Sequence, residues 1–139
     1  MSTSTDVQDL RIAVMRLARR LRTERASDAM TPSQMATLAT LTREGPLSPG
    51  DLAHAERVQP PSMTRILNSL QEAGMVTRTA HPTDGRQVLY ETTDAARTVL
   101  RKDRERRDHW LARKMTTLSP QDRQTLLQAV PILNAIALD

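Results

Sequence analysis

The chain has 139 residues, enough for a single domain with its own hydrophobic core. It holds 20 lysines and arginines against 16 aspartates and glutamates, a basic balance that favours an anionic partner such as nucleic acid. The absence of cysteine excludes disulfides, thiol redox sensing and cysteine-ligated zinc. No run approaches the roughly 18 apolar residues of a membrane span, and the first residues lack the pattern of a signal peptide. We therefore expect a cytoplasmic protein.

The N-terminal segment predicts a long amphipathic helix that begins at Asp6, with residues 1–5 outside it. Its apolar side chains recur every three or four positions, at Val7, Leu10, Val14, Leu17 and Leu21. This spacing is typical of a helix that packs one narrow face against another helix.

A second helix begins in the sequence TPSQ at residues 31–34. Thr31 is suited to the N-cap, Pro32 to the first helical position, and Gln34 to closing a capping box with Thr31. Gly45 and the proline that follows it are expected to end this helix.

Two shorter helices follow in close succession. SPGD at 48–51 predicts a helix over about 48–55, and Pro60 with Pro61 opens another that Gly74 is placed to end. A turn over about 56–59 joins them, so the pair fits a helix-turn-helix.

The second of these helices has two different faces. Its apolar side chains would share a core with the first helix, and its outward face is short and mostly polar, with Pro61, Ser62, Arg65, Asn68 and Ser69. Such a face can enter the major groove of DNA, where an arginine can bridge guanine O6 and N7. The alternative is a helix face that is simply solvated.

The sequence HPTDGRQVLY at 81–90 predicts a β-hairpin with strands near 75–80 and 87–91. A hairpin directly after a helix-turn-helix makes a winged helix. In such a wing Arg86 can enter the minor groove, and Asp84 is expected to accept hydrogen bonds from Arg86, Arg78 or amides of the tip. The alternative is a plain turn with a solvated arginine.

The C-terminal third predicts two more helices, over about 94–116 and from residue 119 onward. Eight charged residues in a row, 101–108, predict a stretch of helix that crosses solvent. Pro131 is expected to kink or split the last helix. The apolar faces of residues 7–21 and 126–137 have no partner large enough within one small chain, so we expect them to form a homodimer.

This order of elements resembles that of the multiple-antibiotic-resistance regulator (MarR) family. The residues that carry the resemblance are SMTRILNSLQEAGMVTR at 62–78 and HPTDGRQ at 81–87, followed by Thr93 at a helix start. It implies a mainly α winged helix-turn-helix with a small two- to three-stranded β-wing. It also implies a homodimeric regulator, often a repressor, that binds pseudo-palindromic double-stranded DNA and is often released by a small aromatic or phenolic ligand.

The resemblance covers residues 1–139 as one chain. It places DNA binding in residues 30–92 and dimerisation in residues 6–25 and 94–139. It matches Ser62, Thr64 and Arg65 to contact positions of the recognition helix, Arg86 to the wing tip, and Asp84 to the acid that holds the wing. The full set of expected DNA-binding residues is Gln59, Pro60, Pro61, Ser62, Thr64, Arg65, Asn68, Ser69, Arg78, Asp84 and Arg86.

Two other classes of function remain open at this stage. One is a winged-helix module that binds protein rather than DNA. The other is a small hydrolase or metal enzyme that uses His54, His81 or His109, although their spacing matches no metal or nucleophile motif. We therefore predict no enzyme activity, no metal and no cofactor.

Overall fold

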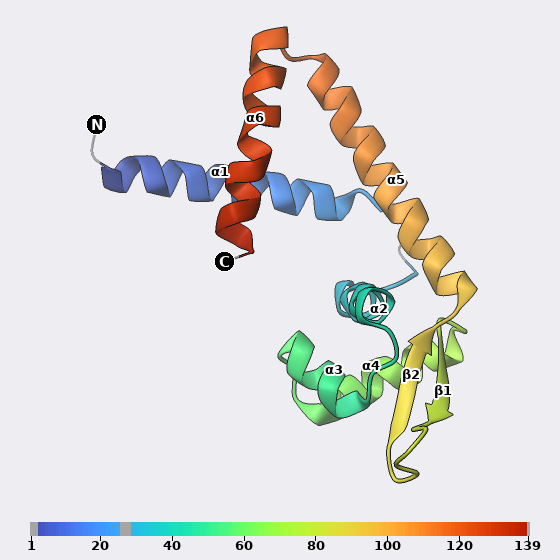
Figure 1. Cartoon of the computed structure of the whole chain (residues 1–139). Helices are drawn as coiled ribbons and strands as arrows, with labels where there is room; N and C mark the ends of the chain where they lie inside the picture. The colour runs from blue at the N-terminus through green and yellow to red at the C-terminus, as the bar shows by residue number, and fades with distance from the viewer. Residues whose placement is uncertain (1–2, 26–28, 139) are drawn as a thin grey trace. The chain divides into compact units, whose positions relative to one another are not determined.

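The computed structural model describes residues 3–25 and 29–138 (Figure 1). Its elements, in chain order, are α1 (Thr3–Thr23), α2 (Pro32–Glu44), α3 (Pro49–Glu56), α4 (Pro60–Glu72), β1 (Val76–Ala80), β2 (Val88–Thr92), α5 (Asp94–Thr116) and α6 (Pro120–Ala137). Met1 and Ser2, which were expected to precede the first helix, and Asp139, which ends the expected dimerisation part, lie outside the described residues. The expected class, mainly α with a small β-wing, is confirmed.

The chain divides into two compact units. One unit spans Arg25–Arg104 and contains α2, α3, α4, the hairpin and the first half of α5. The other contains α1, α6 and the part of α5 that begins at Glu105. The residues expected to read DNA all lie in the first of these units.

The predicted helix starts are formed by the predicted caps. The Thr31 hydroxyl accepts the Gln34 amide at 3.2 Å, and the Gln34 side chain accepts the Thr31 amide at 2.8 Å, which completes the capping box. The Ser48 hydroxyl accepts the Asp51 amide at 3.1 Å at the start of α3. Each bond satisfies a backbone donor that a helix start would otherwise leave open.

The turn between α3 and α4 contains a strained residue. Arg57 has φ 55° and ψ 44°, in the left-handed region that favours glycine. Two backbone bonds hold it there, from the Val58 amide to the Ala53 carbonyl at 3.0 Å and from the Arg57 amide to the His54 carbonyl at 3.2 Å. Gly74 makes the same pattern after α4 with φ 75°, as its place in the sequence predicted.

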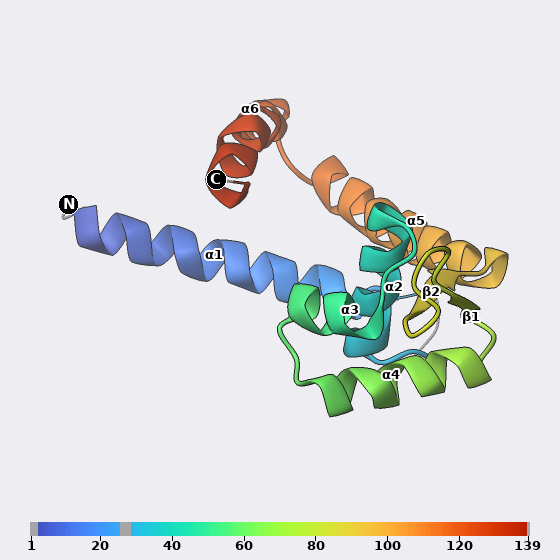
Figure 2. The ribbon, with the colours of Figure 1, turned by 60° about the horizontal axis from the view of Figure 1, so that its bottom comes forward.

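A single aliphatic core fixes the helix-turn-helix. Residues of α2, α3 and α4 are almost completely buried in it, namely Leu38, Leu41, Leu52, Met63, Leu67 and Leu70. Val76 and Tyr90 add the inner side of the hairpin, and Ala96 and Leu100 add the start of α5. Figure 2 shows α4 at the outer side of this unit, so one face of the helix packs inward and the other is open.

The hairpin has its base tied to the helices. β1 pairs with β2 antiparallel, from Val76 opposite Thr92 to Ala80 opposite Val88, and Leu47 adds a short bridge to Tyr90. Thr93 accepts the Ala96 amide at 3.3 Å, as expected of a cap for α5, and donates to the Gly74 carbonyl at 2.7 Å. The base of the hairpin is therefore held next to the C-terminal end of α4.

One expected helix start was wrong, and one of two expected effects of a proline does not occur. α1 begins at Thr3 rather than Asp6, because Asp6 falls in the first turn, where a carboxylate favours the helix dipole and lets the helix start earlier. α6 runs through Pro131 as one helix, so the split does not occur. A proline removes one backbone hydrogen bond, and the bonds on either side are sufficient to continue the helix.

The charged run in α5 was expected to be fully solvated, but part of it is buried. Asp103 is only 1% exposed, and it interacts with other groups of the protein. A buried carboxylate requires such interactions because desolvation would otherwise be costly. The run is therefore a place where α5 packs and not only a solvent crossing.

The other unit leaves wide apolar faces uncovered. In α1, Val7 is 61% exposed and Leu10 is 54% exposed, and in α6, Leu127 and Ile136 are 61% and 67% exposed. Trp110 is only 7% exposed, because the Arg20 guanidinium lies 4.8 Å from its ring centroid and ties α1 to α5. None of the helices in residues 3–25 and 29–138 has both the length and the apolar character needed to cross a bilayer.

Candidate nucleic-acid interface

The outward face of α4 gathers most of the expected contact residues. Met63, Leu67 and Leu70 turn inward, so the 3.6-residue period places the polar set on the opposite side. Ser62 is half-buried, and the others are exposed, namely Gln59, Pro60, Pro61, Thr64, Arg65, Asn68 and Ser69. The structure therefore brings these eight side chains together along α4 and its N-cap residue.

The donors on this face are not equally available. The Arg65 guanidinium donates to the Ser62 hydroxyl at 3.4 Å, close to the limit of a hydrogen bond, so it can turn to another acceptor at little cost. The Thr64 hydroxyl donates to the Pro60 carbonyl at 3.1 Å. A phosphate contact by Thr64 would require that bond to be exchanged, which makes Arg65 the better placed donor.

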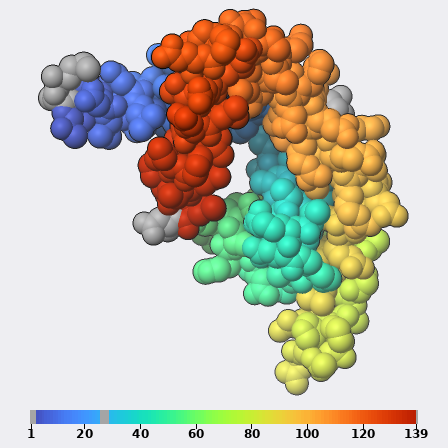
Figure 3. Space-filling model, turned by 45° about the horizontal axis from the view of Figure 1, so that its top comes forward, coloured from blue at the N-terminus to red at the C-terminus, as the bar shows by residue number. Residues whose placement is uncertain are grey.

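The wing presents two charged residues with different surroundings. The Asp84 carboxylate accepts a hydrogen bond from the backbone amide of Arg86 at 3.1 Å. An amide of the wing tip was one of the partners expected for Asp84. The Arg86 residue is exposed to solvent. Arg78 is also exposed, in β1 opposite Tyr90. Figure 3 shows the hairpin tip standing out from the helices of the same unit, where a side chain can reach a groove.

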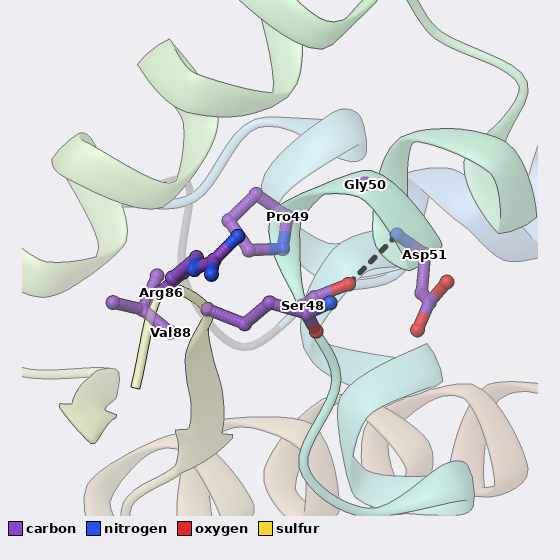
Figure 4. A pocket seen from close by; sticks show the side chains of 7 residues that line it. Ser48, Pro49, Gly50, Asp51, Arg86 and Val88 are labelled. Carbon is purple, nitrogen blue, oxygen red and sulfur yellow. Dashed lines mark hydrogen bonds between the residues drawn. The ribbon is translucent and has the colours of Figure 1, made fainter. Parts of the chain in front are cut away.

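A hollow of about 490 Å³ lies between the wing and the start of α3. It is lined by Ser48, Pro49, Gly50, Asp51, Arg86, Gln87 and Val88. Figure 4 shows the guanidinium of Arg86 directed toward Pro49, while the Asp51 carboxylate points away from it. The positive end of the α3 dipole and the guanidinium thus face the same open space, an arrangement that favours anionic groups.

Sequence reasoning missed two residues near this surface. His81 accepts hydrogen bonds from backbone amides of the wing tip through its ring, although the sequence suggested it as a candidate residue of an enzyme site. Arg57 holds the left-handed turn position, where a sequence would be expected to carry glycine or asparagine. The spacing of His81 before Thr83 and Asp84 could have signalled the first role, since side-chain acceptors commonly cap amides two or three residues on.

The three histidines lie apart, on α3, on the wing and on α5. Across residues 3–25 and 29–138, no group of three or more histidine, aspartate or glutamate side chains comes together in a way that could hold a metal ion. What the structure assembles is a polar helix face and a hairpin tip that exposes Arg86, which together define a winged helix-turn-helix of the DNA-binding class.

Comparison with known proteins identifies the family. The MarR family model matches residues 30–88. An HTH-type transcriptional regulator of Mycobacterium tuberculosis is 43% identical over 128 residues, which cover 92% of this chain and 90% of the relative. The chain belongs to the MarR family, so the resemblance inferred from its motifs is confirmed.

Solved structures agree over the whole length. A protein of Pseudomonas aeruginosa described as a transcriptional regulator superposes with a TM-score of 0.86 at 32% identity, covering 99% of both chains. A MarR family protein of Bacillus stearothermophilus has the same fold, with a TM-score of 0.78 at 20% identity over 100% of this chain and 99% of that one. The protein is therefore a DNA-binding transcriptional regulator.

Proposed function

We propose that the protein represses transcription by binding pseudo-palindromic operator DNA as a homodimer in the cytoplasm, where its chromosomal target lies. The observation that carries the proposal is that one unit holds both the polar face of α4 and the exposed Arg86 of the wing. We assign DNA binding to residues 30–92 and dimerisation to residues 6–25 and 94–139. We propose no catalytic role for the chain.

In this proposal α4 reads base edges and the wing reads a groove. Arg65 contacts a guanine in the major groove, and Asn68 is suited to an adenine. Ser62, Thr64 and Ser69 contact bases or phosphates, and Gln59, Pro60 and Pro61 lie against the backbone or a thymine methyl group at the helix entry. Arg86 enters the adjacent minor groove, Asp84 holds the tip in shape, and Arg78 supports the backbone contact.

Dimerisation is supported by the uncovered apolar faces of α1 and α6. Large aliphatic side chains that are about half exposed lose free energy when a second copy covers them, at roughly 25 cal/mol per Å² of apolar area. A two-fold axis would then present two copies of α4 to half-sites roughly 34 Å apart, one turn of DNA.

Release by a small aromatic or phenolic ligand would have to use contacts other than stacking on the two aromatic side chains of the chain. Tyr90 is 5% exposed within the core, and Trp110 is covered, so neither offers an open stacking surface. Titration of a phenolic acid into the protein–DNA complex tests it, and Trp110, the single tryptophan of the chain, provides a fluorescence signal. Loss of the complex at ligand concentrations that leave the fold intact would support release.

Binding to duplex DNA at increasing salt concentration tests the proposal against a winged-helix module that binds only protein. A DNA-binding unit loses affinity steeply with salt, because each neutralised phosphate releases counterions. We expect the logarithm of the binding constant for duplex DNA to fall linearly with the logarithm of the salt concentration. A protein-interaction module would show no salt-dependent retention.

A further inference from the structure

The tip of the wing is folded around the ring of His81. The ring nitrogen Nδ1 accepts the backbone amide of Asp84 at 3.0 Å and that of Thr83 at 3.2 Å. The Thr83 hydroxyl lies 3.3 Å from the same nitrogen. Backbone amides can donate only to a ring nitrogen that carries no hydrogen, so in this arrangement the ring hydrogen is on Nε2. One side chain thus provides the hydrogen-bond acceptor for two backbone amides of the loop.

The bonds continue from His81 to Arg86. The His81 amide donates to the Gln87 carbonyl at 3.1 Å, and the Gln87 amide donates to the Asp84 carbonyl at 3.1 Å. The Asp84 carboxylate then accepts the Arg86 amide at 3.1 Å. The loop between β1 and β2 is thus closed by two side-chain acceptors in series, with His81 holding Asp84 and Asp84 holding Arg86.

We propose that His81 is a positioning residue for DNA binding, which acts through Nδ1 to hold the wing tip in the conformation that presents Arg86. The inference rests on the proposed function, in which Arg86 contacts the operator. A wing that samples other conformations binds less tightly, because the apparent affinity falls with the fraction of molecules in the competent conformation. His81 therefore contributes to affinity without touching DNA.

The opposite assignment would have His81 contact a phosphate through Nε2–H. The two assignments use different ring atoms, so they predict different substitutions that restore function. Asparagine places its carbonyl oxygen near the position of Nδ1. This oxygen can accept a hydrogen bond from the backbone amide two residues further along the chain. Glutamine places its amide near the position of Nε2 and can donate to a phosphate.

The test compares the variants His81→Asn, His81→Gln and His81→Ala for affinity to operator DNA at one salt concentration. We expect His81→Asn to bind like the wild type, and His81→Gln and His81→Ala to bind about threefold to tenfold more weakly, as expected for the loss of one or two net hydrogen bonds. Binding by His81→Gln that matches the wild type while His81→Asn is weak would overturn the proposal in favour of a phosphate contact. Equal binding by all variants would also overturn it.

A double-variant comparison shows whether His81 acts through Arg86. In an Arg86→Ala background, His81→Gln should weaken binding no further, since the side chain that it positions is gone. An equal loss in both backgrounds would mean that His81 acts independently of Arg86, contrary to the proposal.

A measurement without DNA separates failure of this inference from failure of the proposed function. Hydrogen exchange by NMR should show the Thr83 and Asp84 amides protected in the wild type and in His81→Asn, and about tenfold less protected in His81→Gln. Equal exchange in all variants would show that the ring does not hold the loop. If the wild type binds no operator while the amides are protected, the proposed function fails and His81 retains only its structural bonds.

Discussion

At the scale of single residues, the interface combines polar side chains that differ in how firmly they are already hydrogen-bonded. Arg65 donates a long hydrogen bond of 3.4 Å to Ser62, whereas the Asp84 carboxylate accepts the Arg86 amide at 3.1 Å. We therefore expect base reading to depend on Arg65 and wing shape to depend on Asp84. Since Asp84 holds the backbone of Arg86, we expect removal of the Arg65 side chain and removal of the Arg86 side chain to have different consequences.

Arg65→Ala should weaken binding to the operator by about 1–3 kcal/mol and relax the preference at one base pair, because a bidentate contact to guanine is lost. Competition between the operator and its single-base variants measures both effects. Arg104→Ala is a matched control, since it removes the same charge from an exposed position in α5. A similar loss in both variants would mean that Arg65 supplies only general charge.

Arg86→Ala should reduce the slope of log affinity against log salt by about one, because one cation no longer displaces counterions from the DNA. Preference among sequences should change little outside the region that the wing covers. Titrations at four or more salt concentrations give the slope. An unchanged slope would place Arg86 away from the DNA.

At the scale of the elements, the helix starts, the hairpin and the end of α4 could be predicted from sequence because local chemistry determines them. The cap residues Thr31 and Ser48, and glycine at position 74, each act on backbone groups within a few residues. Burial of Asp103 could not be predicted, since its neighbours in sequence are charged and the surface that covers it comes from tertiary packing. The left-handed Arg57 could not be predicted either, because residue preferences oppose it.

Asp103→Ala should lower the free energy of unfolding by about 1–3 kcal/mol, because it empties a buried position and removes the interaction that Asp103 makes there. Asp108→Ala, an exposed position in the same charged run, should change it by less than about 0.5 kcal/mol. Urea unfolding at a single protein concentration measures both. Equal small effects would mean that the burial of Asp103 contributes little to stability.

Arg57→Gly should leave the free energy of unfolding unchanged or raise it by up to about 1 kcal/mol, because glycine adopts the left-handed turn without steric cost but loses more entropy on folding. Arg57→Val should lower it by more than about 1 kcal/mol, since a β-branched residue is least tolerant of that conformation. Urea unfolding again provides the measurement. A destabilised glycine variant would show that the arginine side chain itself supports the turn.

At the scale of the whole molecule, the wide apolar faces of α1 and α6 lead us to expect a second copy. Leu127 is 61% exposed, so Leu127→Glu should cost little within one chain but should disrupt an apolar interface between copies. Sedimentation at several concentrations should show a dimer for the wild type and a monomer for the variant. A wild-type monomer at every concentration would contradict the homodimer.

The most direct test of the central claim is selection of bound sequences from random duplex DNA by the wild-type protein. If two copies of α4 and two wings read the DNA, the selected sequences will share a pseudo-palindrome whose half-sites are centred one helical turn apart. The same selection with Arg65→Ala should lose preference at one position in each half-site. Selected sequences without two-fold symmetry, or the absence of any enriched sequence, would contradict the account.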